Sequence, residues 1–297
     1  MLGPTAAGKS SLALRLAEDF GAHIISVDSM QVYRGMDIGT AKPTIAEQAR
    51  VSHHMIDLVD PDVRFTVAEF QKEGLRVLQD LSNDGTAALI VGGSGLHFRA
   101  LVDPLEFPPH DPDVRARIEA MEQPAARARL LEIDPTAGNV VDLANPRRVQ
   151  RAVEVYELTG LTPTVRAARP AARAVAGYQA VRPFVAVGVD PGAELSGRVA
   201  GRLRDMLAAG FMSELAELAG SLGPTAAEAV GYKQLLPVVR GEAKEEQGVL
   251  QAVRATMGLA KRQRTYFRRD PRIRWVPWSN DPLDRYEQVK RSLMEDM

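Results

Sequence analysis

The sequence contains no cysteine, which excludes a disulfide framework, a thiol nucleophile and a zinc site with cysteine ligands. No stretch approaches the ~18 apolar residues of a membrane span. The sequence also does not open with the charged segment and apolar segment of a secretory leader. A formal net charge of −1 argues against binding of nucleic acid through overall charge, although local patches remain possible. We therefore expect a soluble, untargeted, cytoplasmic protein without a membrane partner, and we expect a monomer.

The composition itself is that of an ordinary globular protein. The 297 residues are 45% hydrophobic and 25% charged, which suffices for one large core or for a core with an inserted subdomain. Function must therefore be sought in motifs.

The most specific motif lies at the start of the chain and matches the phosphate-binding pattern G-x-x-x-x-G-K-[ST]. Its residues are Gly3, Pro4, Thr5, Ala6, Ala7, Gly8, Lys9 and Ser10. In such a P-loop, backbone N–H groups and the start of a helix face the phosphates, Lys9 reaches the outer phosphate, and the Ser10 hydroxyl can ligate Mg²⁺. By itself the motif predicts nucleotide binding, as in an ATP-binding protein. A glycine-rich turn before a helix would explain the glycines but not the Gly-Lys-Ser sequence.

The P-loop begins unusually close to the start of the sequence. Such a loop normally follows a buried parallel strand, and only Met1 and Leu2 precede Gly3. Either the recorded start lies inside the true coding sequence, or the first strand is a two-residue stub that weakens the sheet. We expect the former, with the first strand truncated.

Two further loops follow apolar runs that are typical of strands. Residues 22–27 end at Asp28, and residues 87–91 end at a second glycine-rich loop that contains Ser94. Ligands of open α/β sheets bind at the carboxyl ends of parallel strands, so these loops and the P-loop should meet. Asp28 could instead cap a turn, and the second loop could be a plain tight turn. The segment 29–43 has no clean period and is interpreted as a binding loop.

The alternation of strands and helices stops near Pro108. Helices are predicted to begin at Pro112, Pro124 and Pro146, the last running to Glu157, and a buried strand resumes at residues 184–189. The predicted fold is α/β, a P-loop NTPase-like parallel sheet flanked by helices with a mainly helical insertion. Residues 1–109 and 183–297 would form the catalytic core, and residues 110–182 the insertion.

Arginines gather in two places in this otherwise nearly neutral chain. Arg147, Arg148 and Arg151 lie away from the apolar face of the third inserted helix, and Arg166, Arg169 and Arg173 follow in a loop without acids. A second group lies between residues 261 and 274. Each arginine alone could be a solvated surface charge, whereas the clusters indicate an anionic ligand.

The sequence as a whole resembles the bacterial tRNA dimethylallyltransferases. These are isopentenyltransferases that prenylate the adenine next to the anticodon. The matching motifs extend over nearly the whole chain and are residues 3–10, 26–29, 33–43, 54–61, 92–95, 231–234 and 260–263. The resemblance implies transfer of a dimethylallyl group from dimethylallyl diphosphate to the exocyclic amine of adenine, with Mg²⁺ and release of diphosphate.

The resemblance also implies roles for particular residues. Asp28 would accept the proton of the amine, Ser94 would contact the donor or the base, and Lys9 would stabilise the leaving diphosphate. Lys233 and Arg262 would support the diphosphate, and Ser10 would ligate the metal. The tRNA-binding set would be Asp28, Ser29, Met30, Gln31, Ser94, Arg147, Arg148, Val149, Gln150 and Arg151. Two departures from the family are His97, where the family commonly has tyrosine, and the missing first strand. At Ser94 the family usually has threonine.

Three alternatives stay open at this point. An adenylate isopentenyltransferase that acts on free AMP or ATP would have no use for an arginine-rich insertion. A P-loop small-molecule kinase or nucleotide switch would share the first motif, although no guanine signature and no clear Walker-B acid occur. A non-catalytic RNA-binding module would leave the P-loop unexplained.

Overall fold

The structure is a computed structural model that describes residues 1–295, and the chain divides into two compact units. The first consists of Met1–Leu101 and Pro183–Met297, and the second of Val102–Arg182. The sequence places the first boundary at residue 110. The second unit begins earlier, because a 2.8 Å backbone hydrogen bond from Val181 to Val102 already joins its two ends there.

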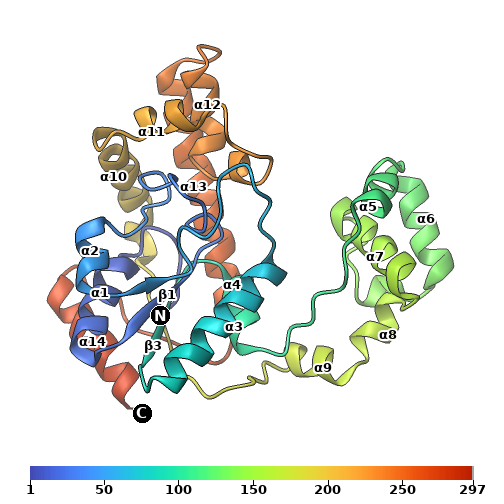
Figure 1. Cartoon of the computed structure of the whole chain (residues 1–297), viewed down its shortest axis with the longest axis horizontal. Helices are drawn as coiled ribbons and strands as arrows, with labels where there is room; N and C mark the ends of the chain where they lie inside the picture. Colours follow the sequence, from blue (N-terminus) through green and yellow to red (C-terminus); the bar gives the residue numbers. More distant parts are fainter. Residues whose placement is uncertain (296–297) are drawn as a thin grey trace. The chain divides into compact units, whose positions relative to one another are not determined.

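Parallel strands form the centre of the first unit (Figure 1). Strand β1 (His23–Val27) lies between β2 (His53–His54) and β3 (Ala88–Gly92), and β4 (Ala186–Gly188) pairs with β5 (Ile273–Trp275). In the register, Val27 is opposite Gly92 and Gly188 is opposite Trp275. The α/β class with small parallel sheets and flanking helices confirms the predicted fold class.

A single residue, Leu2, connects these two groups of strands. It forms parallel bridges with Gly92 and with Gly188, its N–H donates to Val187 (2.9 Å), and its carbonyl accepts from Val189 (2.9 Å). Leu2 is 0% exposed. The short strand noted in the sequence therefore occupies the centre of the sheet, and the P-loop follows it directly.

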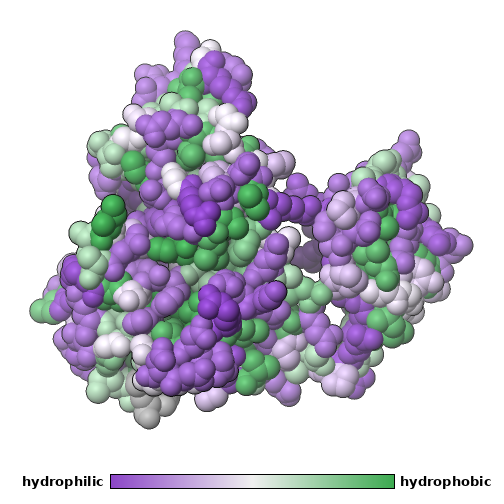
Figure 2. All heavy atoms as spheres, viewed as in Figure 1, coloured by the Kyte–Doolittle hydropathy of each residue, from purple (hydrophilic) through white to green (hydrophobic). Residues whose placement is uncertain are grey.

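Helices cover the sheet and carry the rest of the core. Helix α1 (Lys9–Phe20) follows the P-loop, and its apolar face packs with β3 and with α14 (Pro282–Met294). The other helices of the first unit are α2 (Ile45–Arg50), α3 (Val67–Asn83), α4 (Gly95–Val102), α10 (Leu195–Ala208), α11 (Phe211–Leu218), α12 (Tyr232–Val239) and α13 (Glu245–Phe267), with short 3₁₀ turns at Gly192–Glu194 and Ala226–Glu228. Polar side chains cover most of the visible surface, with apolar residues among them in small groups (Figure 2).

The second unit is helical and has its own core. It contains α5 (Pro112–Glu119), α6 (Gln123–Ile133), a 3₁₀ turn (Ala137–Asn139), α7 (Pro146–Thr159), α8 (Pro163–Ala167) and α9 (Pro170–Ala176). Ile118, Leu130 and Val153 are among the buried residues that pack together. The predicted starts at Pro112 and Pro146 are confirmed, because a side chain caps each helix immediately before its proline.

One local prediction in this unit is wrong. The segment that carries Arg166, Arg169 and Arg173 was expected to be a loop, but it forms α8 and α9. Each helix has proline at its first position, and the Thr162 side chain caps α8 by accepting from the N–H of Val165. Alanine-rich sequence after such a start favours a short helix over a loop.

Candidate anion-binding site

The P-loop has glycine at two points where φ is positive, a conformation that favours glycine. Gly8 precedes α1 with φ 76°, and Gly3 has φ 149°. A Cβ atom at Gly3 would lie 2.1 Å from the carbonyl oxygen of Val189, so the loop passes closely against the end of β4. Helix α1 starts at Lys9, which places the positive end of the helix at the loop.

A cavity of about 720 Å³ opens beside the P-loop. The other loops that the sequence brings to this edge contribute Asp28 and Gln31 after β1, and Gly92 and Gly93 after β3. The P-loop contributes Thr5, Ala6, Ala7, Gly8, Lys9 and Ser10. The structure therefore brings together three loops that lie far apart in the sequence.

Among the described residues, four Lys and Arg side chains line this cavity: Lys9, Lys42, Arg198 and Arg202. Lys9 Nζ donates to the carbonyl oxygen of Pro4 (2.7 Å), and Arg198 Nε donates to that of Ala6 (2.7 Å). Burial lowers the pKa of Lys9 to about 7; the charge of Arg202 adds to this and Asp28 opposes it. Burial also lowers the pKa of Arg202, again with Asp28 opposing. The cavity is thus suited to a ligand with several negative charges.

Sequence reasoning missed Arg198 and Arg202. They lie four residues apart on α10, beside the core stripe of Val199 and Leu203, and both line the cavity. Their spacing of four residues, which places both on one face of the helix, is the sequence feature that could have indicated an anion-binding role.

Asp28 lies where β1 ends and has two structural roles. Its Oδ1 atom accepts a 2.9 Å hydrogen bond from the N–H of Met30, so the side chain does cap a turn. The same residue lines the large cavity and a second, smaller one. A turn-capping carboxylate is therefore also available to a ligand.

The second cavity has a volume of about 100 Å³ and mostly apolar walls. Thr5, Asp28 and Arg202 line both cavities, so the two adjoin at this polar end. The apolar walls come from Met30, Val199, Leu203, Met206, Phe211, Ala229, Val230 and Leu259.

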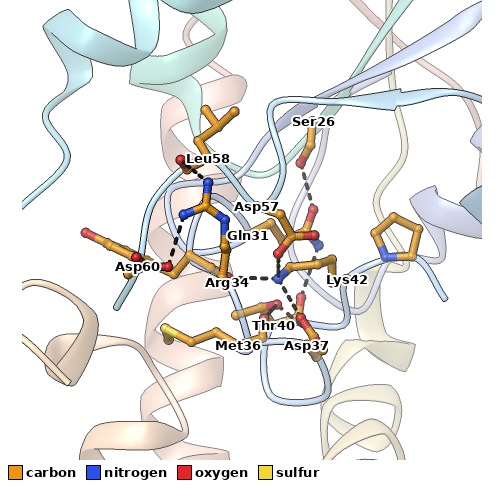
Figure 3. A network of polar contacts seen from close by, with 12 residues as sticks. Ser26, Gln31, Arg34, Met36, Asp37, Thr40, Lys42, Asp57, Leu58 and Asp60 are labelled. Atoms are coloured by element: carbon orange, nitrogen blue, oxygen red, sulfur yellow. Dashed lines mark hydrogen bonds and ion pairs between the residues drawn. The ribbon is translucent and has the colours of Figure 1, made fainter. Parts of the chain in front are cut away.

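The wall formed by residues 29–43 is held by an extensive polar network (Figure 3). Ser26 Oγ donates to Gln31 Oε1 (2.7 Å), and Gln31 Nε2 donates to the carbonyl oxygens of Thr40 (3.2 Å) and Ala41 (3.1 Å). Gln31 thus spans the loop from its start to its end. The segment expected to be a binding loop has a defined conformation.

Lys42 anchors the same loop from inside. Its side chain is 2% exposed, and Nζ lies 2.5 Å from both Asp37 Oδ1 and Asp57 Oδ1. Nζ also donates to the carbonyl oxygen of Tyr33 (2.8 Å). Lys42 lies between the two carboxylates in Figure 3. A buried ammonium is stable only when paired in this way, so these partners hold the loop in place.

Ser94 is hydrogen-bonded to Val27, the residue before Asp28, but it is not among the described residues that line the two cavities. Its N–H donates to the carbonyl oxygen of Val27 (3.0 Å), and its hydroxyl lies 2.6 Å from His97 Nδ1. Burial lowers the pKa of His97 to about 4, with Asp28 opposing, so the imidazole is neutral at pH 7. His97 thus fixes the Ser94 hydroxyl in place.

The two cations expected to support the diphosphate lie elsewhere. Lys233 is exposed and pairs with Glu228 (2.7 Å), and Arg262 is exposed and absent from the described walls of both cavities. The next residue, Gln263, does line the large cavity, and its Oε1 accepts from the N–H of Thr5 (2.8 Å). Successive helical residues point about 100° apart, which separates Arg262 from Gln263.

Acids pair with several arginines near the end of the first unit. Asp190, whose side chain is 7% exposed, accepts from Arg264 (2.6 Å) and Arg268 (3.2 Å). Arg272 pairs with Asp270 (2.7 Å), and Arg274 pairs with Glu295 (2.9 Å). Much of this second basic cluster is therefore neutralised within the protein.

The predicted tRNA-binding residues of α7 differ in their surroundings. Arg147 and Arg148 are exposed, whereas Val149 is buried in the helical core. Arg151 donates to the carbonyl oxygens of Pro108 (3.0 Å) and Pro109 (3.2 Å), and it also pairs with Glu154 (2.8 Å). Gln150 is half-buried. In the first unit, Met30 lines the apolar cavity, and Ser29 is half-buried without lining either one.

Residues 1–295 contain neither a metal-ligand cluster nor a membrane-spanning helix. In that part of the chain, no group of three or more His, Cys, Asp or Glu residues could hold a metal ion. The same residues contain no helix with the length and apolar character that crossing a membrane requires.

The parallel sheet, the P-loop at its central strand and the cation-lined cavity define an α/β protein of the P-loop class. The family model described as IPP transferase matches residues 31–270, and the chain belongs to that family. A tRNA dimethylallyltransferase of Streptomyces avermitilis is 41% identical over 99% of this chain and 95% of its own length. A tRNA dimethylallyltransferase of Thermobifida fusca is 43% identical over 96% of this chain and 91% of its own length.

Solved structures agree with this assignment. The tRNA isopentenylpyrophosphate transferase of Staphylococcus epidermidis is 29% identical with a TM-score of 0.72, covering 100% of this chain and 98% of its own. A eukaryotic dimethylallyltransferase, described as acting on tRNA, has a TM-score of 0.77 over 99% of this chain and 78% of its own. At 22% identity, the latter bears on the fold alone.

Proposed function

We propose that this protein is a tRNA dimethylallyltransferase. It transfers a dimethylallyl group from dimethylallyl diphosphate to the exocyclic amine of the adenine next to the anticodon and releases diphosphate. One observation carries the proposal: Asp28 lines both the cation-lined P-loop cavity and the adjoining apolar cavity. A carboxylate between a phosphate site and an apolar site suits the transfer of a small apolar group.

The prenyl donor would span the two cavities. Its diphosphate would lie on the P-loop, near Lys9 and Arg202, and its hydrocarbon tail would enter the apolar cavity. Cleavage of the carbon–oxygen bond increases the negative charge on the diphosphate. The backbone N–H groups of the P-loop, together with these cations, would stabilise that charge as it forms.

Asp28 would serve as the base. The amine nitrogen forms a bond to the first carbon of the dimethylallyl group while the bond from that carbon to the diphosphate oxygen breaks. The proton lost by the amine passes to the Asp28 carboxylate, which also orients the weak nucleophile. Asp28 lies at the junction of the two cavities, where this exchange would occur.

The residues of the site fit Mg²⁺ that arrives with the diphosphate. This ion is commonly held by phosphate oxygens, water and one or two protein oxygens rather than by a protein cage. The P-loop offers Ser10, which lines the large cavity, as such an oxygen ligand. When bound, the ion would neutralise charge on the leaving diphosphate.

The acceptor is proposed to be the anticodon stem-loop of tRNA. Arg147 and Arg148 are exposed at the start of α7 and would contact backbone phosphates. The target adenine must leave its stack, at a cost of a few kcal/mol, and the preformed loop from Asp28 to Gln31 would receive it beside Ser94. Because tRNA is the acceptor, we place the enzyme in the cytoplasm, and we propose that it acts as a monomer.

Two other functions are less well supported. A free AMP or ATP acceptor would not require a separate unit with exposed arginines on α7. A small-molecule kinase would transfer the phosphoryl group and would have no use for an apolar cavity next to the P-loop. The relatives from Streptomyces avermitilis and Thermobifida fusca are tRNA dimethylallyltransferases, which favours the tRNA acceptor.

One experiment separates these functions. The protein is incubated with Mg²⁺ and labelled dimethylallyl diphosphate, together with unmodified tRNA, AMP or no acceptor, and ATP hydrolysis is measured in parallel. Label incorporated into tRNA alone is the expected result. Label in AMP, or ATP hydrolysis without prenyl transfer, would refute the proposal.

A further inference from the structure

The ring of Phe211 forms the far wall of the apolar cavity. Phe211, Gly39 and Gly231 line this cavity but not the large one, so they lie away from the polar junction. A Cβ atom at Gly39 would lie 2.3 Å from Phe211 Cε2, and one at Gly231 would lie 3.2 Å from Cε1. The edge of the ring therefore fits between two glycines and closes the space there.

Several contacts fix the ring in this position. Phe211 is 1% exposed, and its ring packs edge-on against Tyr232 with centroids 4.9 Å apart. The Tyr232 hydroxyl donates to Glu214, whose carboxylate also accepts from the N–H groups of Ile38 (2.6 Å) and Gly39 (3.1 Å). The aromatic pair and the loop at Gly39 are thus held by the same carboxylate, and the ring cannot turn aside without disturbing both.

The size of the cavity follows from this wall. Its volume of about 100 Å³ suits a short branched hydrocarbon group. A second isoprene unit would have to pass through the position of the Phe211 ring, and close-packed protein interiors do not yield such space without repacking.

We propose that Phe211 sets the length of the prenyl group that the enzyme accepts, restricting donors to five-carbon allylic diphosphates. This inference rests on the function proposed above. Phe211 acts by occupying space and contacts no reacting atom. Removing its ring should allow the cavity to receive the tail of the ten-carbon donor geranyl diphosphate.

The test compares Phe211→Ala and Phe211→Leu with the wild-type chain, using Mg²⁺, unmodified tRNA and either dimethylallyl or geranyl diphosphate. The kcat/KM ratio of geranyl to dimethylallyl donor should rise by roughly tenfold or more in Phe211→Ala, and by less in Phe211→Leu. Phe267→Leu is the matched control, because Phe267 is equally buried but lines neither described cavity. Its ratio should not change.

A second measurement does not require turnover. Thiolodiphosphate analogues of both lengths compete for binding to each variant, and thermal unfolding confirms that the variants are folded. Folded Phe211 variants that keep the wild-type preference would overturn the inference, and so would loss of binding of both analogues. Failure of the wild-type enzyme to prenylate tRNA would instead refute the proposed function.

Discussion

The ammonium group of Lys9 donates a 2.7 Å hydrogen bond to the carbonyl oxygen of Pro4, within its own P-loop. Burial lowers the pKa of Lys9 to about 7, so close to neutral pH the group is only partly charged. A bound diphosphate would favour the charged form and raise this pKa. Ligand binding above pH 7 should therefore include uptake of a proton by Lys9.

This coupling predicts how diphosphate affinity depends on pH. Below pH 7 the contribution of Lys9 is fully present, and above pH 7 it should decline by up to tenfold per pH unit until the pKa of the complex is reached. Calorimetric titration with inorganic diphosphate at pH 8, in two buffers of different ionisation enthalpy, measures the proton uptake. Lys9→Arg should abolish the part of the proton uptake that is due to Lys9, because arginine stays charged. An unchanged uptake in this variant would contradict the prediction.

The Asp28 carboxylate is expected to be needed for turnover but not for RNA binding. Asp28→Asn keeps an oxygen that can accept from the N–H of Met30, so the turn should survive, while the base is lost. We expect single-turnover rates to fall by about 10²- to 10⁴-fold with little change in tRNA affinity. Rates and gel-shift affinities measured on the same preparations check this. Normal turnover in Asp28→Asn would exclude the residue as base.

Arg202 should matter for donor binding, and Arg262 should not. Arg202→Ala removes a cation from both cavity walls, and we expect KM for dimethylallyl diphosphate to rise by roughly tenfold, as for a lost charged hydrogen bond. Arg204→Ala is the control, because Arg204 is exposed on the same helix. Steady-state kinetics measure KM for dimethylallyl diphosphate in these variants and in Arg262→Ala. A larger rise in KM for Arg262→Ala than for Arg202→Ala would contradict the prediction.

Loss of Lys42 should destabilise the first unit. Lys42→Met removes a buried cation that bonds Asp37, Asp57 and the carbonyl oxygen of Tyr33, so we expect the free energy of unfolding to fall by about 1–3 kcal/mol. Urea unfolding measures this free energy in the variant and in the wild-type chain. Arg34→Met provides the comparison, because the pair between Arg34 and Asp60 is exposed and should contribute less than about 1 kcal/mol. Equal losses in the two variants would refute the anchoring role.

The arginines of α7 should separate into two groups. Replacing both Arg147 and Arg148 with alanine should weaken tRNA binding. The slope of log affinity against log salt concentration should become shallower by about two, one for each lost phosphate contact. Arg151→Ala should mainly lower stability, because Arg151 pairs with the buried Glu154. Binding at several salt concentrations and thermal unfolding of each variant distinguish these effects. A steeper salt dependence in the double variant would be inconsistent with phosphate contacts.

Local patterns predicted several of the helices and strands. The apolar runs that end at Asp28 and near Gly92 form β1 and β3, and the prolines at 112 and 146 begin α5 and α7. These features depend on neighbouring residues, and caps and proline geometry act within one turn. The helices α8 and α9 were missed because their composition resembles that of a loop. Both begin with proline, but only α8 has a side-chain cap, from Thr162.

The sequence by itself determined the P-loop, the helix that follows it and the carboxylate at the end of β1, because each depends on a few adjacent residues. Only the tertiary structure decided which cations surround the ligand. Arg202 is brought to the P-loop by the packing of α10, whereas Arg262 points elsewhere on α13 although it adjoins Gln263. The apolar cavity likewise exists only because Phe211 meets Gly39 and Gly231 in space. Such contacts join residues far apart in the chain, and no local pattern encodes their distance or direction.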